Sequence, residues 1–252
     1  MRSKLKASAL LIALVGWEVV ARAGVFSPFI FPSISGSILW GIRNYVDVLE
    51  SAWVTLRLLL VSILISTVVS LIIGGLASIS KSIRIIAETF TSIFIPIPSV
   101  SLLPFALLWF GLGEKPIVFI TSFGAIWIFT LNIINGFATV NKTLIDVGRN
   151  FGLERWKMVW HILIPSAFPS ILTGFKSAWA VSWRTVVASE LVLGSVGMKG
   201  GLGWVIYCQR FRFNPNGMMA ALMCISIIGI FMENVLLERI ENETIKKWGM
   251  KV

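Results

Sequence analysis

Six apolar stretches alternate with shorter polar segments along the chain. A helix needs about 20 mostly apolar residues to cross a bilayer, and these stretches are close to that length. They cover residues 7–23, 53–79, 93–110, 117–137, 168–193 and 217–237. Between the first two, residues 37–49 are predicted to form a short amphipathic helix at the membrane surface. The pattern predicts an all-α, polytopic membrane protein with six transmembrane helices in a single domain, residues 1–252.

Composition supports a membrane protein and excludes several enzyme classes. The chain is 56% hydrophobic and 13% charged, whereas soluble domains average roughly 45–50% apolar and about 25% charged residues. Two cysteines, Cys208 and Cys224, are too few for a disulfide framework. The single histidine, His161, excludes the His-rich metal centres of membrane oxidases and desaturases. We therefore predict no metal site and no catalytic residue.

Basic residues predict the orientation of the chain in the membrane. The net charge is +10, and most of the 22 Lys and Arg residues lie in the two terminal segments and in loops on the same side. Cytoplasmic segments carry an excess of Lys and Arg. We therefore expect both termini and residues 138–167 in the cytoplasm. The same alternation argues against a nucleic-acid partner.

The predicted cytoplasmic loop of residues 138–167 is long for a connection between helices. Asn141 or Thr143 can cap a short helix, and Gly152 can end it. A second amphipathic helix is predicted to follow and to stop at Pro165. The loop is basic and rich in Trp, so it suits either an anionic lipid surface or a protein partner.

Spacing within this loop resembles the cytoplasmic signature of binding-protein-dependent ABC importer permeases. That signature reads Glu-Ala-Ala, three residues, Gly, nine residues, and then Ile-x-Leu-Pro. In this chain Asp146 begins the first triplet, Gly152 takes the glycine position, and residues 162–165 read Ile-Leu-Ile-Pro. The resemblance implies a coupling helix that docks on a separate cytoplasmic ATPase, and it favours docking over lipid binding. The docking residues that it implies are Asp146, Val147, Gly148, Arg149, Gly152, Ile162 and Pro165.

Shorter segments resemble the nitrate/sulfonate/taurine branch of these permeases. They are residues 55–57 (Thr-Leu-Arg), 98–104 (Pro-Ser-Val-Ser-Leu-Leu-Pro), 188–190 (Ala-Ser-Glu) and 201–203 (Gly-Leu-Gly). The resemblance implies a multi-pass permease of a prokaryotic cell (inner) membrane, surrounded by lipid and paired as a homodimer. It also implies two ATPase subunits, an extracellular or periplasmic substrate-binding protein, and a small anionic solute moved by alternating access.

The chain contains no Gly-Lys dipeptide, so it has no phosphate-binding P-loop. We therefore assign ATP and Mg²⁺ to the partner ATPase and expect no cofactor and no enzymatic activity in this chain. A membrane enzyme would need a converging nucleophile and base or a metal cluster. A stand-alone ion-coupled transporter or channel is the alternative, because charges in the fifth span would suit it.

The fifth predicted span contains ionised residues, each of which costs about 2.5–3.5 kcal/mol at the bilayer centre. Trp179, Trp183 and Glu190 fall on one helical stripe, and Arg184 lies about 120° from Glu190 around the helix. The Arg184 guanidinium suits a sulfonate, carboxylate or nitrate group; an ion pair with another helix is the alternative. Prolines in the third span predict a kinked helix that lines the solute path; a kink with a structural role only is the alternative. The predicted path residues are Trp179, Trp183, Arg184, Glu190, Pro98 and Pro104.

Overall fold

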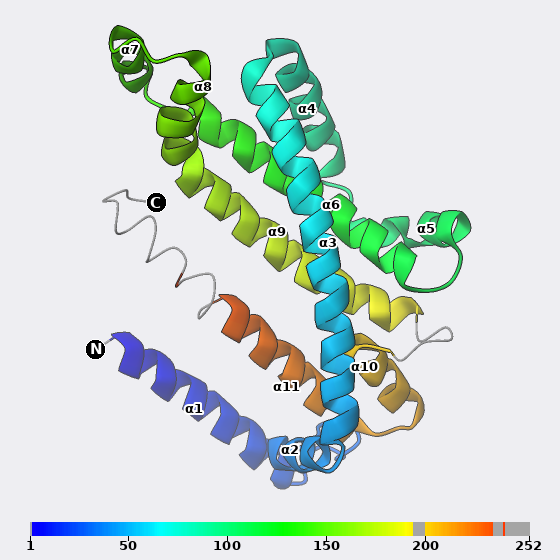
Figure 1. Cartoon of the computed structure of the whole chain (residues 1–252). Coiled ribbons are helices and arrows are strands. Elements are labelled where there is room, and N and C mark those ends of the chain that lie inside the picture. The colour runs from blue at the N-terminus through cyan, green and yellow to red at the C-terminus, as the bar shows by residue number, and fades with distance from the viewer. Residues whose placement is uncertain (1, 194–199, 234–238, 240–252) are drawn as a thin grey trace. The chain divides into compact units, whose positions relative to one another are not determined.

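The structure is a computed structural model that describes residues 2–193, 200–233 and 239. Over these residues it is helical and contains no strand (Figure 1). The predicted all-α fold class is therefore confirmed. The chain divides into two compact units, Met1–Arg57 with Val187–Gly229 and Leu58–Val186 with Ile230–Val252. The prediction of a single permease domain stays a prediction.

Unit 1 contains α1 (Arg2–Arg22), α2 (Ile34–Arg43), the first part of α3 (Tyr45–Ile79), α10 (Leu202–Phe211) and α11 (Pro215–Phe231). Glu18 of α1 fastens the beginning of α2, because its carboxylate accepts the backbone N–H groups of Ile34 at 2.8 Å and Ser35 at 3.2 Å. These N–H groups have no partner inside their own helix. The core of the unit joins α10 to α11 through Val205, Ile206 and Ala221.

The predicted surface helix over residues 37–49 is wrong in its boundaries. Helix α2 ends at Arg43, and α3 begins at Tyr45. Asn44 separates them, with its side-chain amide donating to the Trp40 carbonyl at 2.8 Å. Asn competes well for backbone groups at helix ends, so one polar residue divides a stretch that otherwise has helical periodicity.

Unit 2 contains the rest of α3, then α4 (Lys81–Phe94), the short helix η1 (Ser99–Leu102), α5 (Leu103–Phe110) and α6 (Glu114–Ala138). It continues through α7 (Lys142–Asn150), α8 (Arg155–Met158) and the π-helical turn η2 (Val159–Leu163) into α9 (Ile164–Leu193), whose residues from Val187 onward belong to unit 1. Helices α4 and α5 both pack on α6. The α4 contact includes Phe94, whose ring centroid lies 4.7 Å from that of Trp127 and 5.2 Å from that of Phe123.

Helix α6 also packs against α9, and small residues allow the close approach. A side chain on Gly174 of α9 would lie 2.5 Å from Cβ of Asn132, and one on Gly136 of α6 would lie 2.9 Å from Cβ of Ser170. Phe129 and Ala178 join the two helices in a buried cluster. Close backbone contact at small residues is the usual way in which helices associate in membranes.

The predicted third span, residues 93–110, is not one helix. Helix α4 ends at Phe94, and the segment from Ser99 to Phe110 turns by 88° from it (Figure 1). Pro98 precedes η1, and Pro104 lies in the first turn of α5, where its missing N–H needs no partner. The prolines therefore mark a break with a sharp turn, where a kink was predicted.

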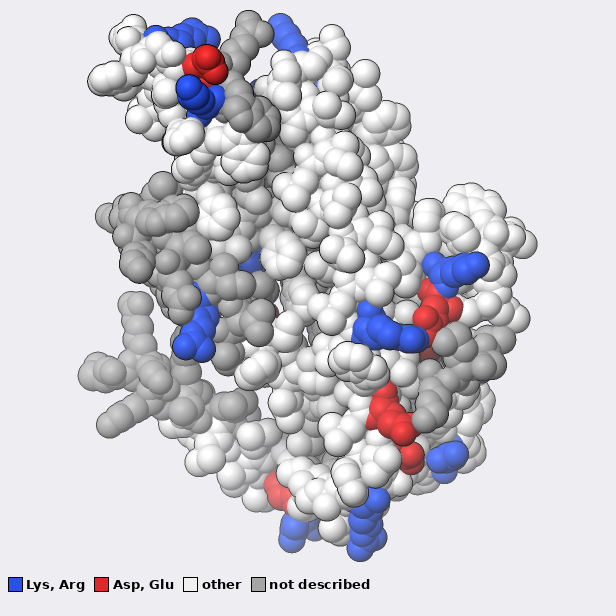
Figure 2. Space-filling model, in the orientation of Figure 1, with Lys and Arg blue, Asp and Glu red and all other residues white. Residues whose placement is uncertain are grey.

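By length and composition, α3 and α6 can each cross a bilayer, and the bent pair of α4 with η1 and α5 makes a third crossing if it counts as one span. These are results for the described residues only. The part of α3 that belongs to unit 2, residues 58–79, has no charged residue, and its visible surface is uncharged in Figure 2. The six-helix count stays a prediction.

Candidate functional site

Helix α7 is the element that the signature predicts as the coupling helix. Asn141 caps its beginning, since the Asn141 side chain accepts the backbone N–H of Thr143 at 2.9 Å. This confirms Asn141 as the cap. At the other end Gly152 has φ = +70°, a left-handed conformation that costs other residues about 1–2 kcal/mol.

Two backbone hydrogen bonds close the C-terminal end of α7. The N–H of Gly152 donates to the Arg149 carbonyl at 2.9 Å, and the N–H of Leu153 donates to the Gly148 carbonyl at 3.0 Å. Together they form a Schellman motif, which satisfies carbonyls that a helix end leaves free. The predicted role of Gly152 as the end of the first loop helix is confirmed.

Gly148 joins the two ends of the signature. It is buried in α7, and a Cβ on it would lie 2.5 Å from Cδ1 of Ile162 and 3.4 Å from Cδ1 of Leu153. Ile162 lies in η2, on the returning arm of the loop. The small residue of the first triplet and the isoleucine of the last motif are therefore in direct contact within this chain. This contact fixes α7 against the beginning of α9.

The outer surface of α7 carries apolar side chains without a cover among the described residues. Leu144 is 46% exposed, Val147 44% and Phe151 82%. Their spacing of three and four residues places them on one stripe of the helix. Asp146 and Arg149 form an exposed ion pair at 3.8 Å, which contributes little to stability. Figure 2 shows acidic and basic side chains together over α7.

The second half of the loop differs from the prediction. Instead of one amphipathic helix that stops at Pro165, the chain forms α8, the π-helical turn η2, and then α9 from Ile164. Pro165 lies in the first turn of α9, directly after the π-helical turn, so the chain is helical on both sides of this proline. The π-helical turn changes the hydrogen-bonding pattern just before the proline, and the helix continues through Pro165 to Leu193.

The predicted path residues are distributed over three elements. On α9, Trp179 is buried, Trp183 is partly buried, and Arg184 is exposed with its Nε donating to the Ala180 carbonyl at 3.0 Å. Pro98 lies at the break before η1, and Pro104 lies in α5; both residues are exposed. Within the described part of the chain, no hydrogen bond, ion pair or ring contact joins any of these residues to another of the set.

Glu190, the sixth predicted path residue, lies in a buried cluster of unit 1. Its side chain is 2% exposed, and each carboxylate oxygen lies 3.0 Å from the Thr55 hydroxyl. The N–H of Gly203 donates to Oε2 at 3.0 Å, and the N–H of Leu202 donates to Thr55 Oγ1 at 2.8 Å. Sequence reasoning did not find this contact. Its only signal was that residues 55–57, 188–190 and 201–203 all matched one branch of the family.

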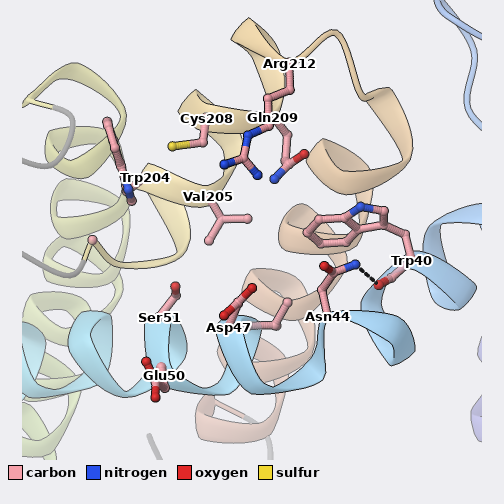
Figure 3. Close-up of a pocket in the computed structure, with 12 residues that line it drawn as sticks. Trp40, Asn44, Asp47, Glu50, Ser51, Trp204, Val205, Cys208, Gln209 and Arg212 are labelled. Atoms are coloured by element: carbon pink, nitrogen blue, oxygen red, sulfur yellow. Dashed lines mark hydrogen bonds between the residues drawn. The ribbon is translucent and has the colours of Figure 1, made fainter.

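A second feature that the sequence did not show is a cavity of about 310 Å³ in unit 1. Figure 3 shows Asp47 and Arg212 directed into it from opposite walls. Trp40 and Trp204 also line it. The cavity therefore offers a carboxylate, a guanidinium and two indole rings. Among the described residues no group of three or more His, Cys, Asp or Glu side chains could hold a metal ion.

Several transporter permeases are similar in sequence to this chain. A putative ABC transporter permease of Methanocaldococcus jannaschii is 28% identical over 232 residues, covering 90% of this chain and 84% of that protein. The taurine transport system permease protein TauC of Escherichia coli is 24% identical over 233 residues, covering 89% of this chain and 82% of TauC. The nitrate import permease protein NrtB of Synechocystis is 26% identical over 171 residues, covering 68% of this chain and 61% of NrtB.

The fold is similar to that of a solved importer. A chain of the MetNI methionine ABC transporter in an inward-facing conformation superposes with a TM-score of 0.67 at 20% identity, covering 80% of this chain and 98% of that chain. The family model for binding-protein-dependent transport system inner membrane components matches residues 66–246. This chain therefore belongs to that family, the membrane-embedded permease subunits of ABC importers.

Proposed function

We propose that this permease works as a homodimer in a prokaryotic cell membrane and imports a small anionic solute by alternating access. Separate ATPase subunits dock on α7 and supply ATP hydrolysis, and an external binding protein delivers the solute. Membership of the binding-protein-dependent family supports this over a stand-alone ion-coupled transporter. The basic residues of the terminal segments and of residues 138–167 support a cytoplasmic position for both termini and for α7.

The exposed apolar stripe of α7 carries the docking proposal. Leu144 and Val147 lie on a nine-residue helix that is held at both ends, and Phe151 is the residue that follows it. An amphipathic helix whose apolar side chains face outward fits a hydrophobic groove of a partner protein. Because Gly148 and Gly152 fix the hairpin in advance, the partner need not order it on binding, and less conformational entropy is lost.

Co-purification of the ATPase with the permease tests this docking. Phe151→Asp places a charge at the most exposed side chain of the apolar stripe, and Gly152→Asp disturbs both the left-handed turn and the end of the helix. We expect both variants to lose the ATPase. Lys142→Glu is the matched control, because Lys142 is exposed and lies on the opposite side of α7 by helical spacing. Normal ATPase binding and uptake by both test variants would refute the docking role of α7.

The solute proposal rests on relatives and on one side chain. The similar permeases named above serve taurine and nitrate transport systems, and related permeases are named for aliphatic sulfonates. Arg184 supplies an exposed guanidinium on α9, which can bind an anionic oxygen group with two parallel hydrogen bonds. Calorimetry of the partner binding protein against nitrate, taurine and an alkanesulfonate tests the solute class. Binding of none of the three would overturn it.

A further inference from the structure

Glu190 is a meeting point for three segments that are far apart in the sequence. Its carboxylate accepts the hydroxyl of Thr55 from α3 and the N–H of Gly203 from the first turn of α10, while Glu190 itself belongs to α9. Thr55 and Glu190 are almost completely buried. No basic side chain of the described residues forms an ion pair with Glu190. The two donors therefore compensate for the burial of this carboxylate.

The backbone of α10 is shaped to lie directly on this carboxylate. Any Cβ on Gly201 would collide with Oε1 of Glu190 and with the hydroxyl of Thr55. A Cβ on Gly203 would lie 2.5 Å from the Val187 carbonyl and 2.7 Å from Cβ of Glu190. The contact thus requires glycine at both positions. Four residues from three segments therefore pack closely together here: Thr55, Glu190, Gly201 and Gly203.

Helix α9 connects this cluster to the coupling loop. It runs without a break from Ile164, where the loop ends, to Leu193, just beyond Glu190. We propose that Glu190 is a positioning residue for transport, which fixes α10 to α3 and α9 so that a movement of the coupling loop reaches α10. The inference rests on the proposed function, because it assumes that ATPases drive the loop. Helix α10 in turn supplies Trp204 and Cys208 to the wall of the cavity (Figure 3).

A cysteine on α10 can report this movement without knowledge of the solute. Cys208 lines the cavity and is partly exposed (Figure 3), and Cys224→Ser leaves it as the single thiol of the chain. The measurement is the rate of Cys208 alkylation by N-ethylmaleimide in the complete permease–ATPase complex, with and without ATP and vanadate. We expect the two rates to differ in this background.

Variants of Glu190 then separate hydrogen bonding from charge. In Glu190→Ala we expect the two alkylation rates to become equal, although the ATPase still co-purifies and still hydrolyses ATP. Glu190→Gln should keep the difference, because its amide oxygen can accept the Gly203 N–H and its NH₂ group can donate to Thr55, whose hydroxyl then donates to the Ser51 carbonyl 3.2 Å away. Val192→Ala, which truncates a side chain that is 64% exposed, is the control on the same helix.

Thr55 provides a second, independent set of variants. Thr55→Val should behave as Glu190→Ala does, and Thr55→Ser should behave as the parent. Loss of the ATP-dependent difference in Glu190→Gln, or its persistence in Glu190→Ala, would overturn the inference. Failure of both Glu190→Ala and Thr55→Val to assemble would also overturn it, because the cluster would then serve folding alone. Equal rates in the parent complex would refute movement of α10, whereas absence of ATPase from that complex would refute the proposed function itself.

Discussion

Gly148 of α7 lies directly against Ile162 of the returning arm, so closely that one added methyl group would come within 2.5 Å of the Ile162 Cδ1 atom. Gly148 is the last residue of the first triplet of the family signature, and Ile162 is the first residue of its Ile-Leu-Ile-Pro segment. Their contact explains why the signature needs a fixed spacing. The chain must turn at Gly152 and return through residues 153–161 for Ile162 to reach Gly148.

Enlarging Gly148 and shortening Ile162 tests the contact between them. Gly148→Ala should destabilise the hairpin by about 1 kcal/mol through overpacking. Ile162→Val removes the Cδ1 atom that would be too close and should cost about 0.5–1.5 kcal/mol alone. In the double variant we expect the two costs to cancel in part, and ATPase co-purification to exceed that of Gly148→Ala. A double variant that shows the sum of both defects would contradict the contact.

The left-handed conformation of Gly152 predicts an order among substitutions. Apart from its two chain neighbours, no residue has a heavy atom within 4 Å of the position that a Cβ would take, so the backbone strain acts alone. Gly152→Ala should cost about 1–2 kcal/mol in the stability of the turn. Gly152→Asn should cost less, because Asn adopts this conformation more readily. Titration of each purified permease with the ATPase measures the order; equal affinities for both variants would show that the turn tolerates any residue.

Two adjacent glycines on α3 should respond in opposite directions. A Cβ on Gly74 would lie 2.5 Å from Cγ2 and 2.8 Å from Cβ of Ile133, whereas a Cβ on Gly75 would meet nothing within 4 Å. Gly74→Ala should lower the thermal stability of the detergent-solubilised protein, since the Cβ of Ile133 is fixed to its backbone. Gly75→Ala should raise it slightly, because Ala is favoured over Gly in a helix by about 1 kcal/mol. Equal shifts of the melting temperature would argue against close packing of α3 on α6.

Arg184 allows a functional role to be separated from a structural one. Its side chain is exposed and donates to the Ala180 carbonyl of its own helix. We therefore expect unchanged stability and ATPase assembly together with reduced uptake of the anion that the binding protein binds. Arg184→Lys should restore part of the uptake, because it keeps the charge but loses the planar fork. Unchanged uptake in Arg184→Ala would remove this residue from the solute path.

Hydropathy predicted the position of some helices correctly, but it could not predict where the chain changes direction. The predicted span over residues 117–137 agrees with α6 (Glu114–Ala138), because charged and polar residues bound its apolar run. The span over residues 93–110 is apolar on both sides of its break, so hydropathy could not reveal the 88° turn. Cap residues succeeded at Asn141 and Gly152, since a cap depends on neighbouring residues only.

Contacts between residues that are far apart in the chain could not be predicted from the sequence. Thr55 and Glu190 are 135 positions apart, and helical periodicity places a residue on a face without saying what that face meets. The stripe with Trp179, Trp183 and Glu190 is predicted to face the solute path or a second subunit. The sequence did not show that Glu190 bonds to Thr55 and to the first turn of α10. The homodimer, the orientation of the termini and the path set stay predictions.

The contacts that fix the position of α7 depend on side-chain volume and backbone conformation, and very little on charge. The Gly148–Ile162 contact and the turn at Gly152 involve no ionised group, while the Asp146–Arg149 pair is open to water. Salt screens exposed charges but leaves apolar packing intact. A change in ionic strength should therefore leave the conformation of this hairpin unchanged.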